Sequence, residues 1–246
     1  MARSFGSTTA GLTENIPASL LGWNSDTTIS AWAYVNVNST AVNGHRCGMQ
    51  SVAGPRGLYL QAYGTSGTST DWGGVVAGVN YVTAGETLAL NQWHHLAFVH
   101  NSGTGNQFVY RAGALKNSAS LGGYTACIAG DLASVVHQDA GSNYFADLAI
   151  WKAMLSAPEI SALANGIRPK RIRTPSLAVW IPMDGIESSE SDLAGNGLSA
   201  TLAGTTAFVS GPPFDPQTSR WPQPAPFVPQ VSVAYQRAQQ ILMTGP

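Results

Sequence analysis

Charged residues are scarce in this chain of 246 residues: Asp, Glu, Lys and Arg make up 10% of it, and the formal net charge is −1. Soluble domains typically contain about 25% of these residues. Binding to nucleic acid or to an acidic membrane depends on clustered positive charge, so the composition predicts neither partner. Small, weakly polar residues replace the missing charges, and such a surface suits contact with sugars or with other protein subunits.

Long apolar segments and cysteines are also sparse. No stretch approaches the roughly 20 apolar residues of a membrane-spanning helix. The N-terminal segment up to Leu21 lacks the apolar core of a secretory signal, so we expect neither a membrane span nor a signal peptide. Cys47 and Cys127 either form a disulfide or remain reduced, and the sequence leaves both alternatives open.

Alternation of apolar and polar residues predicts β-strands along most of the chain. In the strand that includes Ile29, an aliphatic face alternates with an aromatic and polar face formed by Ser30, Trp32 and Tyr34. Further strands are predicted at 57–63, 75–82, 87–90, 93–100, 107–111, 124–129, 132–136, 198–202 and 207–209. The Gly/Ser/Thr-rich segment 64–71 is predicted to be a loop. With 44% hydrophobic residues, the chain is expected to be globular and all-β.

One short helix is predicted between two strands at 145–151 and 177–183. Ser156 is placed to cap this helix, and Glu159, three residues later, is placed to complete a capping box. Gly166 supplies the left-handed residue that ends it. The helix is therefore at most about three turns long, and its single apolar stripe must lie against a larger element.

Four segments carry a more specific signal: TTISAW at 27–32, WHHLAFV at 93–99, ADLAIWKAMLSAPEISAL at 146–163 and DLAGNGL at 192–198. In sequence and order they resemble the laminin-G-like and concanavalin-A-like jelly-roll family, over roughly Phe5 to Val209. The resemblance implies an antiparallel jelly-roll β-sandwich, in which the Trp-His-His motif is structural. Lectins, glycosidases, adhesion modules and virion proteins share this fold, so it does not assign a function by itself.

The composition changes after residue 210, which divides the chain into a sandwich at 1–210 and an arm at 211–246. The arm contains eight of the fourteen prolines, so it cannot form a regular sheet strand or a long helix. It also keeps large aromatic residues, which we expect to anchor it to its own domain or to a neighbouring copy: Phe214, Trp221, Phe227 and Tyr235. A disordered tail is the alternative.

Catalytic chemistry finds little support in the sequence. A glycosidase needs two carboxylates held at a fixed separation, and the close pair Glu190 and Asp192 falls in a segment predicted to be a loop. His94 and His95 are neighbours on a predicted strand, so they point to opposite faces and cannot share a metal ion. We therefore predict that the protein is not an enzyme.

Sugar binding is a better candidate, because it needs exposed aromatic rings beside small polar residues. The segment from Tyr63 to Tyr81 has this composition, and the candidate residues are Tyr63, Asp71, Trp72 and Asn80. The alternative is that these aromatic residues belong to the core. Where the resembled family usually has Asp-Gly after a Tyr strand, this chain has Ala112-Gly113, which lowers the support for a lectin.

Calcium is the one candidate cofactor, because laminin-G-like domains often hold this ion at the rim of the sandwich. The oxygen ligands that calcium prefers occur in predicted loops at Asp184, Asp192 and Asn196. The alternative is that Asp192 and Asn196 only make hydrogen bonds within turns.

A fold usually found outside cells, combined with no secretion signal, suggests a protein that leaves the cell on a particle. Our first hypothesis is therefore a non-catalytic structural or adhesive module on a phage or virus particle, as capsid decoration or as part of a tail or fibre. Its expected partners are other virion subunits, including copies of itself as a homo-oligomer, and it would be located on the virion surface. The alternatives are a carbohydrate-binding, lectin-like module and an extracellular location.

Overall fold

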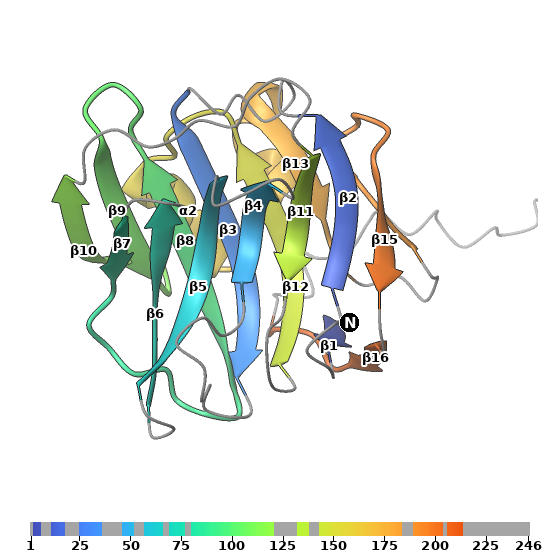
Figure 1. Ribbon diagram of the computed structural model, residues 1–246, viewed down its shortest axis with the longest axis horizontal. Coiled ribbons are helices and arrows are strands. Elements are labelled where there is room, and N and C mark those ends of the chain that lie inside the picture. Colours follow the sequence, from blue (N-terminus) through green and yellow to red (C-terminus); the bar gives the residue numbers. More distant parts are fainter. Residues whose placement is uncertain are drawn as a thin grey trace, which may run out of the picture.

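Two antiparallel β-sheets pack face to face and form a sandwich (Figure 1). The computed structural model describes residues 2–5, 11–17, 25–35, 46–51, 57–65, 69–76, 80–120, 132–137, 143–183, 189–203 and 206–213. This architecture confirms the predicted all-β jelly-roll class. The arm residues Phe214, Trp221, Phe227 and Tyr235 lie outside the described residues, as does Cys127, so the predictions about them stay untested.

Sheet A contains the segments that carry most of the predicted family signal. Its strands, in spatial order, are β10 (Ala114–Ser120), β9 (Asn106–Arg111), β8 (Gln92–His100), β3 (Thr27–Val35), β12 (Asn143–Trp151), β1 (Ala2–Phe5) and β16 (Thr206–Val209). One further strand, β13 (Leu177–Ile181), pairs with the second half of β12, whereas β1 pairs with the first half.

Sheet B faces sheet A across the core. Its strands, in spatial order, are β14 (Ser189–Ser191), β15 (Ser199–Ala203), β2 (Gly11–Pro17), β11 (Leu132–His137), β4 (Arg46–Ser51), β5 (Gly57–Thr65), β6 (Ser69–Val76) and β7 (Asn80–Thr83). Every strand pairing among the described residues is antiparallel, as expected for a jelly roll.

The inner faces of the two sheets form the main hydrophobic core. The aliphatic residues that alternate along β3, beginning with Ile29, are all buried in it, as their spacing predicts. Phe98 of sheet A lies directly over Gly74 of sheet B, where an added Cβ would come within 1.9 Å of the ring. A glycine is therefore required at this position, because the sheets approach too closely for a side chain.

The predicted short helix is confirmed as α2 (Ala157–Ala164), which lies on the outer face of sheet A, away from sheet B (Figure 1). The Glu159 carboxylate accepts the backbone N–H of Ser156 at 2.7 Å, as the capping-box pattern predicts. Gly166 follows the helix with a φ of 87°. The buried helix residues Ile160 and Leu163 pack onto sheet A, so tertiary contacts stabilise this short element.

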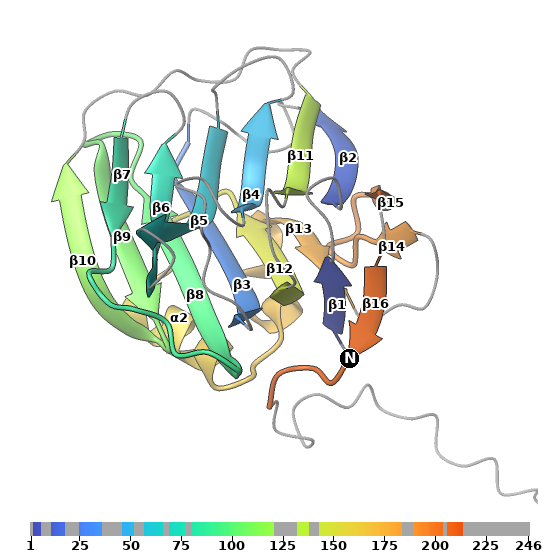
Figure 2. The same cartoon turned by 60° about the horizontal axis from the view of Figure 1, so that its bottom comes forward.

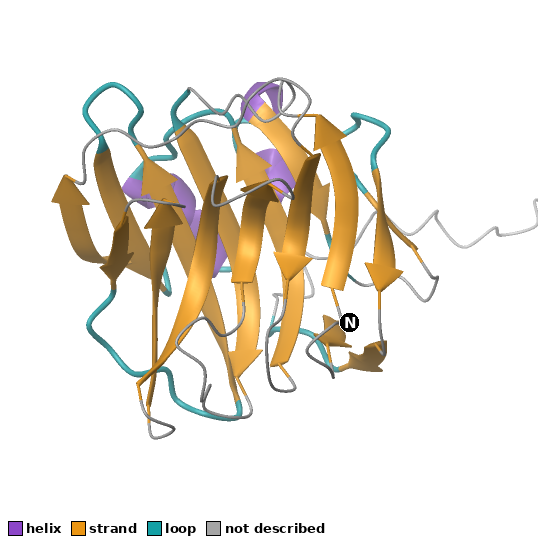
Figure 3. Cartoon of the chain, viewed as in Figure 1, coloured by secondary structure: helices purple, strands orange, loops and turns teal. Residues whose placement is uncertain are grey.

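Two short 3-10 helices, η1 (Pro169–Arg171) and η2 (Thr174–Ser176), follow α2 over the same face of sheet A. Figure 3 shows these helical segments behind the strands of the sandwich. Thr28 ties the beginning of this segment to β3, since its hydroxyl donates to the carbonyl of Ala153 and accepts the N–H of Leu155. Among the described residues, none of the helices has the length and apolar character needed to cross a membrane.

Four sequence predictions of local structure are wrong. The segment 75–82, predicted to be one strand, is divided between the end of β6 and β7, which pair antiparallel. The segment 64–71, predicted to be a loop, belongs largely to the hairpin of β5 and β6. Residues 87–90, predicted to be a strand, form the irregular connection from β7 to β8. Glu190, predicted to lie in a loop, sits in the short strand β14. In each case pairing with neighbouring strands, which the local sequence does not reveal, decides the backbone conformation.

Candidate functional site

The predicted sugar-binding segment does not present its tryptophan to solvent. Trp72 is wholly buried, because its position on β6 points to the core together with Gly74 and Val76. The alternative of a core aromatic is therefore correct for Trp72. Asp71 is half-buried, and its Oδ1 accepts the backbone N–H groups of Trp72 at 2.7 Å and Glu86 at 3.3 Å. Asp71 thus holds the connection that follows β7.

The other two predicted sugar-binding residues lie far from each other on sheet B. Tyr63 is in register with Asp71 across the β5–β6 hairpin. Asn80 is in register with Val76, five residues further along β6, which corresponds to roughly 17 Å at about 3.3 Å per residue. The structure therefore brings Tyr63 beside Asp71 but does not gather the four predicted residues into one site.

The predicted calcium ligands have other roles where the structure describes them. Asp192 accepts the backbone N–H groups of Trp180 at 2.7 Å, Ala194 at 2.9 Å and Asn196 at 3.3 Å. The Asn196 amide donates to the carbonyl of Ala178 at 2.7 Å. Backbone N–H groups that point at a carboxylate occupy the oxygens that a cation would need. These contacts match the alternative of turn hydrogen bonds, and Asp184 lies outside the described residues.

No cluster of three or more His, Cys, Asp or Glu side chains suitable for a metal ion occurs within the described part of the chain. The acid pair proposed and rejected for a glycosidase is buried: Glu190 is 2% exposed and Asp192 is 8% exposed. A substrate would therefore not reach these carboxylates in the conformation described.

The three histidines of β8 are buried, and the prediction that His94 and His95 point to opposite faces is confirmed. His94 Nε2 lies 2.8 Å from the carbonyl oxygen of Ala89, whereas His95 Nε2 lies 2.9 Å from the hydroxyl of Ser30. Burial lowers the pKa of His95 to about 3, and burial also lowers the pKa of His94 and His100. All three therefore carry no charge at neutral pH.

Ser30 and His95 resemble the nucleophile and base of a hydrolase, but their surroundings do not support that chemistry. Both side chains are buried, and among the described residues His95 Nδ1 has no hydrogen-bond partner to orient the imidazole. A base with a pKa of about 3 binds a proton too weakly to activate a serine at neutral pH. The pair therefore acts as a structural hydrogen bond on the outer face of sheet A.

A buried ion pair lies near the middle of β12, where the strand paired with it changes from β1 to β13. Asp147 has a φ of 48° at a bulge between β12 and β3, and its carboxylate contacts Arg168 Nη1 at 2.6 and 2.7 Å. Trp180 Nε1 donates to the same carboxylate at 3.1 Å. The pair thus joins the segment after α2 to the centre of sheet A.

The outer face of sheet A carries a second group of aromatic residues beyond the area that α2 covers. Trp93 of β8, Tyr34 of β3 and Tyr144 of β12 are in direct cross-strand register. We refer to these three residues as the aromatic row. The rings of Tyr34 and Tyr144 are stacked at 5.0 Å with a 22° interplanar angle, and the rings of Tyr34 and Trp93 meet edge to face at 5.5 Å.

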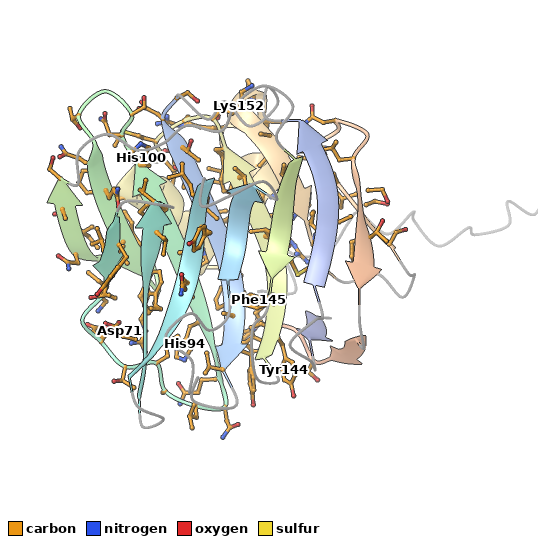
Figure 4. All side chains as sticks on the ribbon, in the orientation of Figure 1. Asp71, His94, His100, Tyr144, Phe145 and Lys152 are labelled. Atoms are coloured by element: carbon orange, nitrogen blue, oxygen red, sulfur yellow. The ribbon has the colours of Figure 1, made fainter. Side chains whose placement is uncertain are left out.

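All three residues of the aromatic row are half-buried, so each retains some accessible surface. Figure 4 places Tyr144 at the lower end of the sandwich, opposite the end that carries His100 and Lys152. The next row along the strands consists of His95, Trp32 and Ala146, all buried, and the Trp32 ring meets the His95 ring at 5.4 Å. The aromatic row therefore lies beside a row of buried residues on the same three strands.

The sequence contained a signal for this row. The aromatic and polar face predicted for the first long strand includes Trp32 and Tyr34, and a contiguous aromatic patch on an outer face is typical of an interaction site. The sequence alone does not reveal the register of β8, β3 and β12, and this register brings Trp93 and Tyr144 beside Tyr34.

Comparison with known proteins is consistent with the sandwich. The family model for the concanavalin A-like lectin/glucanases superfamily matches residues 6–161, a shorter span than the predicted resemblance. No curated protein matches the chain.

Among solved structures, a proposed carbohydrate-binding protein from Bacteroides ovatus matches with a TM-score of 0.56 and 14% identity, over 86% of this chain and 60% of that one. The chain thus spans less than two thirds of that protein, and at this level of identity the similarity shows a shared fold alone. A heptameric SAP-like pentraxin from Limulus polyphemus matches with a TM-score of 0.49 and 18% identity, over 82% of this chain and 88% of that one.

Proposed function

Because this chain belongs to the concanavalin A-like lectin/glucanases superfamily, we propose that it is a non-catalytic carbohydrate-binding module whose binding surface is the aromatic row. The observation that carries the proposal is the register of Trp93, Tyr34 and Tyr144 on the outer face of sheet A, with all three residues half-buried. This surface differs from the sheet B hairpin suggested by the sequence.

The chemistry of the row suits a sugar. Tyr and Trp side chains combine an apolar ring with a polar O–H or N–H at its rim, and they lose little conformational entropy on binding. A pyranose has the matching division, with C–H bonds on its faces and hydroxyl groups around its edge. Tyr34 is flanked by aromatic rings on both sides, so Trp93 and Tyr144 offer the ring surface best placed for such contact.

The proposal excludes catalysis because the candidate acid and base side chains are already engaged in the fold or are uncharged. Asp192 is engaged by three backbone N–H groups, Asp147 is paired with Arg168, and His95 is neutral and buried. Each group is committed to holding the fold, so none of them offers a free acid or base.

A glycan microarray, followed by titration calorimetry with the bound glycans, tests the proposal. We expect Trp93→Ala and Tyr144→Ala to lower the affinity of the bound glycans by about tenfold each, equivalent to about 1.4 kcal/mol. Tyr81→Ala is the matched control, because Tyr81 is 59% exposed on the edge strand β7 of the other sheet. Unchanged affinity in both row variants, or equal loss in the control, contradicts the proposal.

Assembly into a particle is the second candidate function, and exposed apolar side chains on the sandwich edge favour it. Tyr81 on β7 and Leu115 on β10 are 59% and 51% exposed. These two edge strands lie side by side, since the amide of Asn117 on β10 donates to the carbonyl of Thr83 on β7. Such residues suit contact with another subunit, as the virion hypothesis requires.

Density-gradient fractionation of the native source tests this second candidate. If the chain is a particle component, it sediments with particles, and Tyr81→Ala combined with Leu115→Ala releases it. A virion-surface location and a homo-oligomeric state are part of this second proposal. Recovery of wild-type chain only as a soluble monomer contradicts the assembly hypothesis and leaves the carbohydrate proposal unaffected.

A further inference from the structure

We infer that the aromatic row binds an internal stretch of an uncharged, linear polysaccharide, with the sugar chain running across strands β8, β3 and β12 rather than along them. This inference rests on the proposed function and narrows it to one class of glycan. Three features support it: the direction of the row, its open ends and its lack of net charge.

The direction of the row follows from strand register. Trp93, Tyr34 and Tyr144 occupy directly opposed positions on three adjacent strands, so a line through their rings is perpendicular to the strands. Adjacent strands lie about 4.8 Å apart, so the row spans roughly 10 Å. A pyranose has about the footprint of one aromatic ring, and the row therefore matches two to three linked sugars rather than one.

At one end of the row no described strand pairs with β8, and at the other end the described strands that follow β12 carry small residue types in register with Tyr144. β9 pairs with β8 only from Leu96 onward, so at Trp93 no described strand lies on the outer side of β8. Beyond Tyr144, the positions in register are Ser4 on β1 and Ala207 on β16, both small residue types. An internal stretch of a polymer passes over such a row, whereas a terminal sugar requires a closed pocket.

The surroundings of the row carry no net charge among the described residues. The adjacent row of His95, Trp32 and Ala146 is uncharged, because burial lowers the pKa of His95 to about 3. The nearest charge along β12, Asp147, is neutralised by Arg168 at 2.6 Å. Because Arg168 is already engaged by Asp147, it does not offer an anionic sugar a compensating charge, and the row favours an uncharged ligand.

Titration calorimetry of the full chain against two panels of oligosaccharides tests the inference. The uncharged panel consists of linear β-linked glucose, mannose and xylose oligomers, from the monosaccharide to the hexasaccharide. The charged panel consists of galacturonate and mannuronate oligomers of the same lengths. We expect at least one uncharged series to gain at least about tenfold in affinity between one and three units and then to level off.

Two variants and one solvent condition complete the experiment. Trp93→Ala and Tyr144→Ala should each abolish the gain with chain length, and Trp93→Leu, which keeps apolar volume without an aromatic ring, replaces Trp93→Ala if that variant does not fold. Tyr81→Ala should leave the gain intact. Because the contact is uncharged, affinity should be the same in about 1 M salt, where charge interactions are screened beyond about 3 Å.

The outcomes separate the inference from the proposed function. If a monosaccharide binds as tightly as its hexamer, or if only the charged series binds, and the row variants still weaken binding, the inference is wrong and the proposed function stands. If nothing in either panel binds while the microarray shows bound glycans that the row variants weaken, the inference is wrong and the proposed function stands. If the row variants leave all affinities unchanged, the proposed function and the inference both fail.

Discussion

The outer face of sheet A has two halves that are both rich in aromatic residues and yet differ in their surroundings. In the half under α2, η1 and η2, Trp151 is fully buried, and its Nε1 donates to the carbonyl of Ile172 at 2.8 Å. In the other half, the rings of Trp93, Tyr34 and Tyr144 are half-buried and contact one another. Figure 2 shows α2 beside β8, over the covered half.

This difference shows that an aromatic residue on a strand face has no fixed role. The strands β3, β8 and β12 run through both halves, so their local backbone conformation is similar. What changes is the covering segment, which closes over Trp151 and Trp180. Its Ile172 carbonyl accepts the indole N–H of Trp151, whereas the indole N–H of Trp180 donates to Asp147 of β12, which Arg168 of the covering segment contacts. A ring that is covered stabilises the fold, and a ring left half-exposed is available to a ligand.

The largest loss of stability is expected from a substitution in the half of sheet A that α2 covers. Ile160→Ala removes a fully buried side chain from the contact between α2 and sheet A, and we expect a loss of about 3 kcal/mol in the free energy of unfolding. Urea denaturation followed by tryptophan fluorescence measures this change. Glycan affinity of the folded variant should be unchanged, and a parallel loss of affinity would show that the two halves act together.

A smaller loss of stability is expected at the junction of the two halves. Asp147→Asn leaves Arg168 without its carboxylate partner; because Arg168 is 22% exposed, we expect about 2 kcal/mol rather than the roughly 3–5 kcal/mol of a fully buried pair. Chemical denaturation at neutral pH measures the change. Glu86→Gln, which alters an exposed contact with Arg111 and Lys116, is the control and should unfold like the wild type.

Acid should lower the free energy of unfolding through His95, which lies in the half of sheet A that contains the aromatic row. Its pKa is about 3 in the folded state and 6.5 in the unfolded state, so above pH 6.5 both states are neutral and the residue has no effect. As the pH falls below 6.5, the unfolded state gains a proton that the folded state does not, and stability drops by about 1.4 kcal/mol for each pH unit. At pH 5.5 the expected loss from His95 is thus about 1.4 kcal/mol.

Denaturation of the wild type and of His95→Gln at several pH values between 5.5 and 7.5 measures this slope. The window lies above the ordinary pKa of carboxyl groups, so it reports mainly on histidine. His94 and His100, whose pKa values are also lowered by burial, add to the slope in the same direction and remain in the variant. An identical slope in His95→Gln would contradict the assignment.

The smallest stability effect is expected in the aromatic row itself. Tyr144→Ala removes a half-buried ring and its stacking with Tyr34, for an expected loss of at most about 1 kcal/mol. The same change should lower glycan affinity by about tenfold. A large stability loss without a change in affinity would mean that the row, like the covered half, serves only to hold the sheet together.

Much of the fold could be predicted from the sequence, because its signals are local. The alternation around Ile29 predicts which face of β3 is buried, and the Ser156–Glu159 capping box predicts where α2 begins. The hairpin of β5 and β6 could not be predicted, because its Gly/Ser/Thr-rich sequence favours a loop and pairing with neighbouring strands overrides that preference.

The exposure of Trp72 could not be predicted from the sequence for a related reason. Aromatic and small polar residues around Trp72 have the composition of a sugar site, yet composition does not state which way a side chain points. Strand alternation turns Trp72 into the core, next to the glycine that accommodates Phe98. The predicted turn role of Asp192, by contrast, depends on neighbours close in sequence, and the structure agrees with it.

The sequence by itself determined the class of fold, the inner face of β3, the ends of α2 and the near absence of net charge, because each depends on residue type and short-range spacing. Only the tertiary structure decided that Trp93, Tyr34 and Tyr144 form one row and that Trp151 does not belong to it. These residues lie far apart in the chain, and strand register and the path of the covering segment, both long-range properties, bring them together or separate them.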